Sequence, residues 1–176
     1  MNYRHLITQS TSIYERKPYK IEQVLSLNIF NYGAKWMYEN LIYLDNKNRI
    51  INFPYISYNR YGYIKYGICL TIWVLSLFLL MRLNIYLAPV SILIFYFCEV
   101  HFLFLFPLLI DNVKNPILTS IKQTYRIGLF KTIFTVSQIG IFMILGFLNF
   151  KNPFKNWYIG CLAILIWYQN EVRNRV

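Results

Sequence analysis

The chain alternates between polar stretches and long apolar runs, and the longest run provides the first structural prediction. Residues 89–111, PVSILIFYFCEVHFLFLFPLLID, are almost all apolar, with Glu99 and His101 near the middle. At ~1.5 Å rise per residue, a helix over 89–110 is long enough to cross the ~30 Å hydrocarbon core of a bilayer. Pro89 suits the first position of such a helix, because its missing N–H would have no partner there.

Three further apolar runs predict three more membrane-spanning helices, at about 65–82, 127–150 and 153–169. We therefore predict an all-α polytopic membrane protein with four transmembrane helices. Pro107 should bend the second of these helices near Leu103, since its ring clashes with the preceding turn. The predicted domain limits are a four-helix transmembrane domain at 64–170 and a polar tail at 171–176.

Residues 1–63 are rich in Tyr and Asn and are expected to lie outside the membrane. Two short apolar runs, 41–44 and 49–53, flank the polar stretch 45–48 and could form a small β-hairpin. The alternative is an interfacial helix over 21–43, with its aromatic rings at headgroup level.

Composition and charge agree with a membrane protein. The chain is 57% hydrophobic, 19% aromatic and 14% charged, with a net charge of +11, whereas soluble domains carry about 25% charged residues. An excess of Lys and Arg is typical of cytoplasmic loops and of faces that contact anionic lipid. No recognised nucleic-acid-binding motif is present, so we expect a lipid bilayer as partner and no nucleic acid.

The distribution of Lys and Arg predicts the topology. In the four-span arrangement, one side of the membrane holds the N-terminal region, the 111–126 connection and the C-terminal tail, with most of the basic residues. The other side holds only Arg82, Lys151 and Lys155. The positive-inside rule then places both termini on the cytoplasmic side, or on the matrix or stromal side of an organelle. A bacterial inner membrane or an organelle inner membrane would suit this topology.

The connection at 111–126 predicts a short helix on the membrane surface. Asn115 and Pro116 form a typical helix start, as N-cap and first helical residue. An apolar stripe follows on one face of the expected helix. Its members are Ile117, Leu118, Ile121 and Tyr125.

The third predicted span carries a line of polar and small residues on one helical face. Lys131, Thr135 and Gln138 follow one another in steps of three or four, so they point the same way. Polar side chains in lipid need partners. Because Gln138 is expected near the same depth as Glu99, we predict an intramembrane polar network of Glu99, Gln138, Thr135 and Lys131.

Glu99 and His101 are the candidate functional residues. An ionisable side chain at the bilayer centre costs roughly 2.5–3.5 kcal/mol on insertion scales and marks a functional site by default. Positions two apart on a helix differ by about 200°, so the two side chains point to nearly opposite faces. We expect Glu99 to contact Gln138, whereas His101 would face a partner that this chain does not supply.

Three function classes follow. The first is a non-catalytic subunit, or an accessory or assembly factor, of a larger membrane complex, with other membrane subunits or a second copy as partner. The second is a membrane-embedded enzyme or proton-coupled transporter for a lipid or small solute, with Glu99 and His101 as catalytic residues. The third is a haem- or chlorophyll-binding subunit with His101 as cofactor ligand. The three cysteines lie in apolar runs without metal-ligand spacing, so no metal site is predicted.

Overall fold

The structure is a computed structural model that describes residues 2–16, 27–45 and 52–173. Within these ranges the chain forms helices joined by short connections, and it contains no strand. The all-helical class predicted from the sequence is confirmed. The elements are, in chain order, α1 (Tyr3–Arg16), α2 (Ile29–Leu44), α3 (Tyr58–Leu83), η1 (Ile85–Leu87), α4 (Val90–His101), α5 (Leu105–Ile110), α6 (Pro116–Ile127), α7 (Leu129–Gly146) and α8 (Lys155–Glu171).

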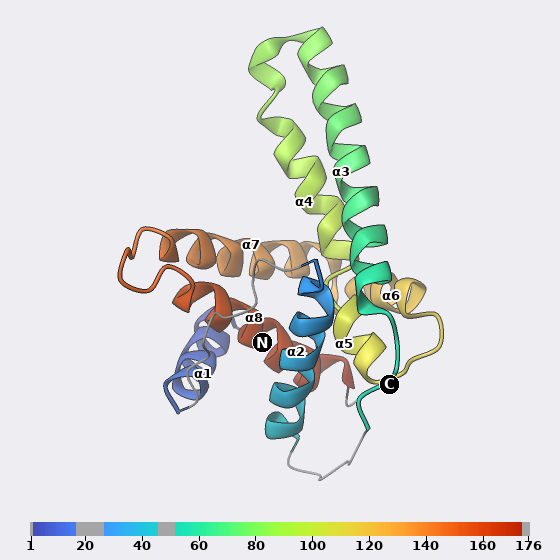
Figure 1. Cartoon of the computed structure of the whole chain (residues 1–176). Helices are drawn as coiled ribbons and strands as arrows, with labels where there is room; N and C mark the ends of the chain where they lie inside the picture. Colours follow the sequence, from blue (N-terminus) through green and yellow to red (C-terminus); the bar gives the residue numbers. More distant parts are fainter. Residues whose placement is uncertain (1, 17–26, 46–51, 174–176) are drawn as a thin grey trace.

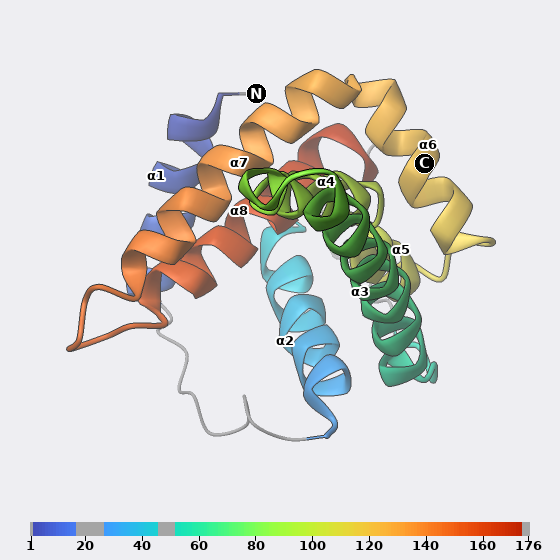
Figure 2. The ribbon, with the colours of Figure 1, turned by 90° about the horizontal axis from the view of Figure 1, so that it is seen from above.

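Two helices project from the rest of the molecule as a hairpin. α3 and α4 run antiparallel and are joined by the turn that contains η1 (Figure 1). The other helices form a body at the base of this hairpin. Within the body, α7 and α8 pair with each other and run across the direction of the hairpin instead of alongside it (Figures 1 and 2).

Three segments are long and apolar enough to cross a membrane, namely Tyr58–Leu83, Ile85–Ile110 and Leu129–Gly146. They overlap three of the four predicted spans, and they are consistent with an integral membrane protein. A fourth span at 153–169 is not confirmed. α8 forms a helix there, but most of its apolar side chains are buried where it packs against α1, α2 and α7.

The second apolar run bends as Pro107 predicts. α4 ends at His101 and α5 begins at Leu105, so the helix is interrupted at 102–104. Every residue of α5 is buried. The run of 89–111 is therefore divided between two environments, because α4 belongs to the projecting hairpin whereas α5 lies in the core of the body.

The N-terminal region is helical where it is described. Residues 41–44 belong to α2, so the first arm of the expected β-hairpin is wrong, and most of its second arm lies outside the described residues. Of the alternative, an interfacial helix over 21–43, the helical conformation is confirmed from Ile29 onwards, and residues 21–26 lie outside the described residues. α3 begins at Tyr58, so the expected domain boundary near residue 63 falls inside a helix.

α5 and α8 form the centre of the core. The ring of Phe104, next to α5, lies with its centroid 5.8 Å from that of Trp167 and 6.1 Å from that of Tyr168. All three side chains are essentially inaccessible to solvent. Burying a large apolar side chain contributes roughly 1.5–3 kcal/mol, so this contact fixes α8 against the base of the hairpin.

Candidate functional site

Glu99 forms an ion pair inside the hairpin. Its Oε1 atom lies 3.4 Å from Nζ of Lys65 on α3, and the two side chains are 31% and 9% exposed. The expected contact between Glu99 and Gln138 does not occur among the hydrogen bonds of the described residues. Lys65 is the first residue of the span predicted at 65–82, and the sequence did not identify this lysine as the partner of Glu99.

The register of the hairpin explains why Lys65 meets Glu99. Asn84 closes the turn, and its side chain accepts a hydrogen bond from the backbone N–H of Tyr86. Residues at similar distances before and after this turn face each other in antiparallel helices. Farther from the turn, Trp73 donates a hydrogen bond to Ser91 at 3.1 Å, and the thiols of Cys69 and Cys98 lie 3.6 Å apart. Equal spacing about Asn84 would place Glu99 opposite Cys69, about one helical turn from Lys65. The turn therefore brings Lys65 near Glu99, but the rotation of the two helices selects it as the partner.

His101 finds its partners within the chain. Its Nδ1 atom is 2.7 Å from the carbonyl oxygen of Phe97, and its Nε2 atom is 3.2 Å from the hydroxyl of Tyr125 on α6. The expectation that His101 faces a group from outside the chain is therefore wrong for its polar atoms. Both ring nitrogens are engaged, one within α4 and one between helices.

The break between α4 and α5 is closed by a hydroxyl from α6. Ser120 donates to the carbonyl of His101 at 2.9 Å and accepts from the backbone N–H of Phe104 at 3.3 Å. Neither backbone group has a hydrogen-bond partner within a helix, because the helix is interrupted between these two residues. Ser and Thr side chains of neighbouring helices commonly satisfy backbone groups freed in this way. Because Ser120 is completely buried, this hydroxyl fixes α6 beside the break.

The predicted polar face of α7 lies beside α8, and among the described residues it forms no hydrogen bond or ion pair with Glu99. Lys131 lies 3.7 Å from Glu171 at the end of α8. Thr135 is buried on the face that packs on α8, whereas Gln138 is half-buried. The four residues of the predicted network are therefore divided, since Glu99 pairs within the hairpin and the other three lie on a helix of the body.

Arg173 forms an ionic cluster that sequence interpretation missed. Its guanidinium lies 3.3 Å from Asp45 Oδ2 and 2.9 Å from Asp111 Oδ1, and the side chain is only 7% exposed. The same guanidinium donates to Gln169 at 3.0 Å. Tyr168 donates its hydroxyl to the other oxygen of Asp111 at 2.7 Å. Asp45 follows α2, Asp111 follows α5 and Arg173 follows α8, so the cluster joins the ends of three helices.

Burial raises the pKa of the Tyr168 hydroxyl well above its ordinary value, and the neighbouring Asp111 carboxylate raises it further. The hydroxyl therefore remains a hydrogen-bond donor over the whole physiological pH range. A buried phenol that only donates to a paired carboxylate is typical of a structural contact. The arrangement of Tyr168, Asp111 and Arg173 thus stabilises the body.

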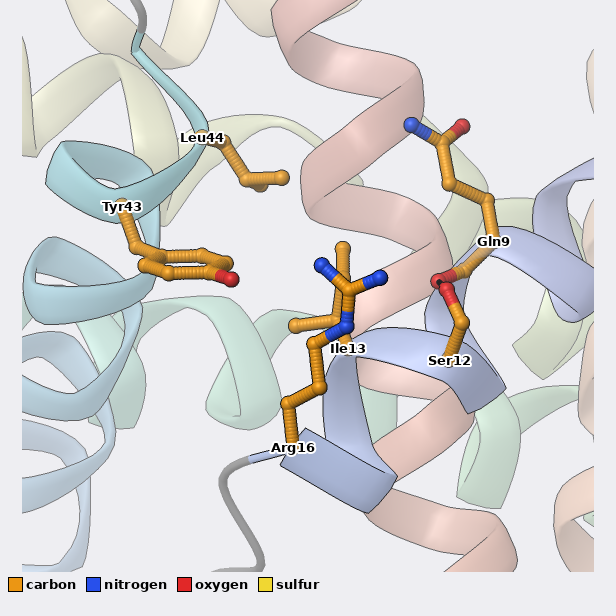
Figure 3. A pocket seen from close by; sticks show the side chains of 6 residues that line it. All are labelled: Gln9, Ser12, Ile13, Arg16, Tyr43 and Leu44. Carbon is orange, nitrogen blue, oxygen red and sulfur yellow. Dashed lines mark hydrogen bonds between the residues drawn. The ribbon is translucent and has the colours of Figure 1, made fainter.

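Two surface hollows lie away from Glu99 and His101. One, of about 440 Å³, lies between α1 and α2, with the Arg16 side chain extending between the two helices (Figure 3). It is lined by Gln9, Ser12, Ile13, Arg16, Tyr43 and Leu44. The other is a smaller apolar hollow on the hairpin, lined by Leu70, Trp73, Ile92 and Phe95.

No group of three or more His, Cys, Asp and Glu residues that could hold a metal ion occurs within 2–16, 27–45 and 52–173. Comparison of the chain with protein-family models, with curated proteins and with solved structures gives no match.

Proposed function

We propose that this protein is a non-catalytic subunit, or an accessory or assembly factor, of a larger membrane complex. The observation that carries the proposal is that Glu99 and His101 both have partners within the chain. Glu99 pairs with Lys65, and His101 contacts Phe97 and Tyr125. The contacts with Lys65 and Tyr125 join one helix to another, which is the role expected of structural polar groups in membrane proteins.

The two alternative functions would each require a group that is already engaged. A haem iron bound by His101 through Nε2 would displace the hydroxyl of Tyr125. A proton carrier at Glu99 would have to exchange its contact with Lys65 during each cycle. Neither residue lines one of the two hollows described above, so we favour the subunit function.

The proposal includes a topology. We infer that the α3–α4 hairpin crosses the bilayer and that both termini lie on the cytoplasmic side, or on the matrix or stromal side of an organelle. Support comes from the charge distribution, because Arg82 is the only Lys or Arg between Tyr66 and Asp111. The four-span arrangement, with α7 and α8 also crossing, would place the termini on the same side.

Gentle-detergent purification of the tagged chain from its native source tests the function. We expect other membrane proteins to co-purify in fixed ratio, and we expect no visible absorbance that depends on His101. A monodisperse isolated chain without partners would contradict the proposal. Absorbance that disappears in His101→Ala would favour the tetrapyrrole-binding alternative.

A pair of variants separates the structural function of Glu99 from a catalytic one. Glu99→Gln leaves Lys65 without its charged partner, so we expect reduced recovery of the complex. The double variant Lys65→Met/Glu99→Gln removes both charges, and we expect it to restore recovery, since a neutral pair of similar volume is tolerated. Loss of an activity in both variants, with the complex intact, would instead indicate a proton carrier.

A further inference from the structure

α7 has two distinct faces. The face that packs on the body contains Thr132, Thr135, Val136, Ile139 and Gly146, all buried. The opposite face is mostly apolar and is exposed towards both ends of the helix, with exposed fractions of 86% for Phe130, 67% for Phe134, 59% for Ile141 and 65% for Ile144. Ser137, in the middle of this face, is half-buried, and α7 contacts α4. The connection after α7 extends this surface, because Leu148 and Phe150 are 70% and 93% exposed. The exposed residues 130, 134, 141, 144, 145 and 148 form the α7 stripe.

The α7 stripe faces the side from which the hairpin projects. α7 lies over α8 and α1, with the hairpin rising on the opposite side of α7 from those two helices (Figures 1 and 2). Because the buried face of α7 contacts α8, the stripe points away from α8 and towards the level at which the hairpin leaves the body. The apolar surfaces of the hairpin and of α7 therefore meet at one face of the molecule.

Charge around the stripe suits a membrane surface. No Asp or Glu occurs from residue 112 to residue 170. Lys131 and Lys151 lie near the two ends of α7, and both are exposed. The six basic residues of this segment are Lys114, Lys122, Arg126, Lys131, Lys151 and Lys155. An apolar face in a segment whose charged residues are all basic suits a helix that lies in the plane of an anionic bilayer surface.

The hairpin has the length needed for one bilayer. The part of α3 beyond Lys65 extends roughly 27 Å at ~1.5 Å per residue, close to the ~30 Å of a hydrocarbon core. Arg82 and the highly exposed Tyr86 lie near the tip. Their side chains suit the far interface, where aromatic and basic residues gather.

We propose that α7 lies along the membrane surface, with its stripe in the hydrocarbon boundary, so that the α3–α4 hairpin alone crosses the bilayer. The inference rests on the proposal that this protein acts in a membrane, and it does not depend on partner subunits. Lipid is the occupant that fits, because the stripe is continuous with the surface that the hairpin presents to the bilayer. A protein that covered the stripe would have to lie within the lipid headgroup layer of the bilayer.

Depth measurement with brominated lipids tests this arrangement. The full chain, with Cys69, Cys98 and Cys161 replaced by alanine, is given one cysteine for a fluorophore at Ile141 or at Leu75. It is then reconstituted into vesicles of phosphatidylcholine with a minor fraction of phosphatidylglycerol. We expect bromine near the headgroups to quench the probe at 141 most, and bromine near the chain ends to quench the probe at 75 most.

The control is Ser12→Cys, at an exposed position of α1 in the body. Its probe should be quenched least by either lipid. Equal depth for the probes at 141 and 75 would overturn the proposal, since that result means that α7 crosses the bilayer. Failure of the vesicle experiment would not affect the proposed subunit function, which is tested by co-purification.

A second measurement does not require the cysteine replacements. A photoreactive benzophenone amino acid at Phe134, in the otherwise native chain, should form adducts with lipid upon illumination. Adducts with a second copy of the chain or with another protein, in place of lipid, would overturn lipid as the occupant of the stripe.

Discussion

Arg173 connects three segments that are far apart in the sequence. Its guanidinium contacts both Asp45 and Asp111 at 7% exposure. Two buried carboxylates would repel each other without the cation between them. The sequence placed Arg173 in a polar tail, because nothing in the local pattern indicates that the chain turns back into the body after α8.

Replacement of Arg173 by alanine should destabilise the body by about 3–5 kcal/mol, because removal of one partner leaves buried charge uncompensated. Thermal unfolding in detergent would measure the effect. Arg173→Lys retains the charge but not the two-pronged geometry, so we expect an intermediate loss. Arg16→Ala, at an exposed position of α1, is the matched control. Equal stability of Arg173→Ala and Arg16→Ala would contradict the structural function of the cluster.

Ionisable residues could be identified from the sequence, but their partners could not. Hydropathy predicts depth in a bilayer, and it led to Gln138 as the partner of Glu99. The contact with Lys65 depends on the rotation and register of two helices. His101 is similar, since its partner Tyr125 belongs to a helix that the sequence placed on the membrane surface without a contact to the second span.

At the scale of helices, local signals predicted the interruptions well. Pro107 predicted the bend near Leu103, and Asn115 and Pro116 predicted the start of α6. The sequence could not show that α5 turns into the core, because an apolar segment suits lipid and protein interior equally. α8 illustrates the same ambiguity. Its helical limits follow from the apolar run, but its buried environment depends on packing by α1, α2 and α7.

The register of the α3–α4 hairpin brings two cysteines into a contact that can be tested. Since the Cys69 and Cys98 thiols lie 3.6 Å apart, a small movement brings their sulfurs to the ~2.05 Å of a disulfide. We expect a mild oxidant such as copper phenanthroline to link them within one chain. Mass spectrometry of the digested protein should detect the linked peptides.

Cys161→Ser provides the control for this cross-link, and it should leave the product unchanged. Cys98→Ser should abolish the product. A dominant link between Cys69 and Cys161, or between two chains, would contradict the observed pairing of α3 with α4.

For the whole molecule, composition and charge predicted the environment but not the number of crossings. The four-span arrangement treats every long apolar helix as a span. In the structure α7 and α8 run across the hairpin (Figure 1). If α7 lies on the surface, Lys151 and Lys155 move to the side of the termini, which leaves Arg82 alone on the far side. The hairpin arrangement therefore follows the positive-inside rule more closely.

Sidedness labelling tests most directly the claim that the hairpin alone crosses. Single cysteines at Ser12, Asn84 and Asn152, in the chain without native cysteines, are exposed to a membrane-impermeant maleimide in sealed vesicles of known orientation. We predict that Asn152→Cys reacts from the same side as Ser12→Cys, and that Asn84→Cys reacts only from the opposite side. Reaction of Asn152→Cys from the same side as Asn84→Cys would mean that α7 crosses the membrane, and it would contradict the account.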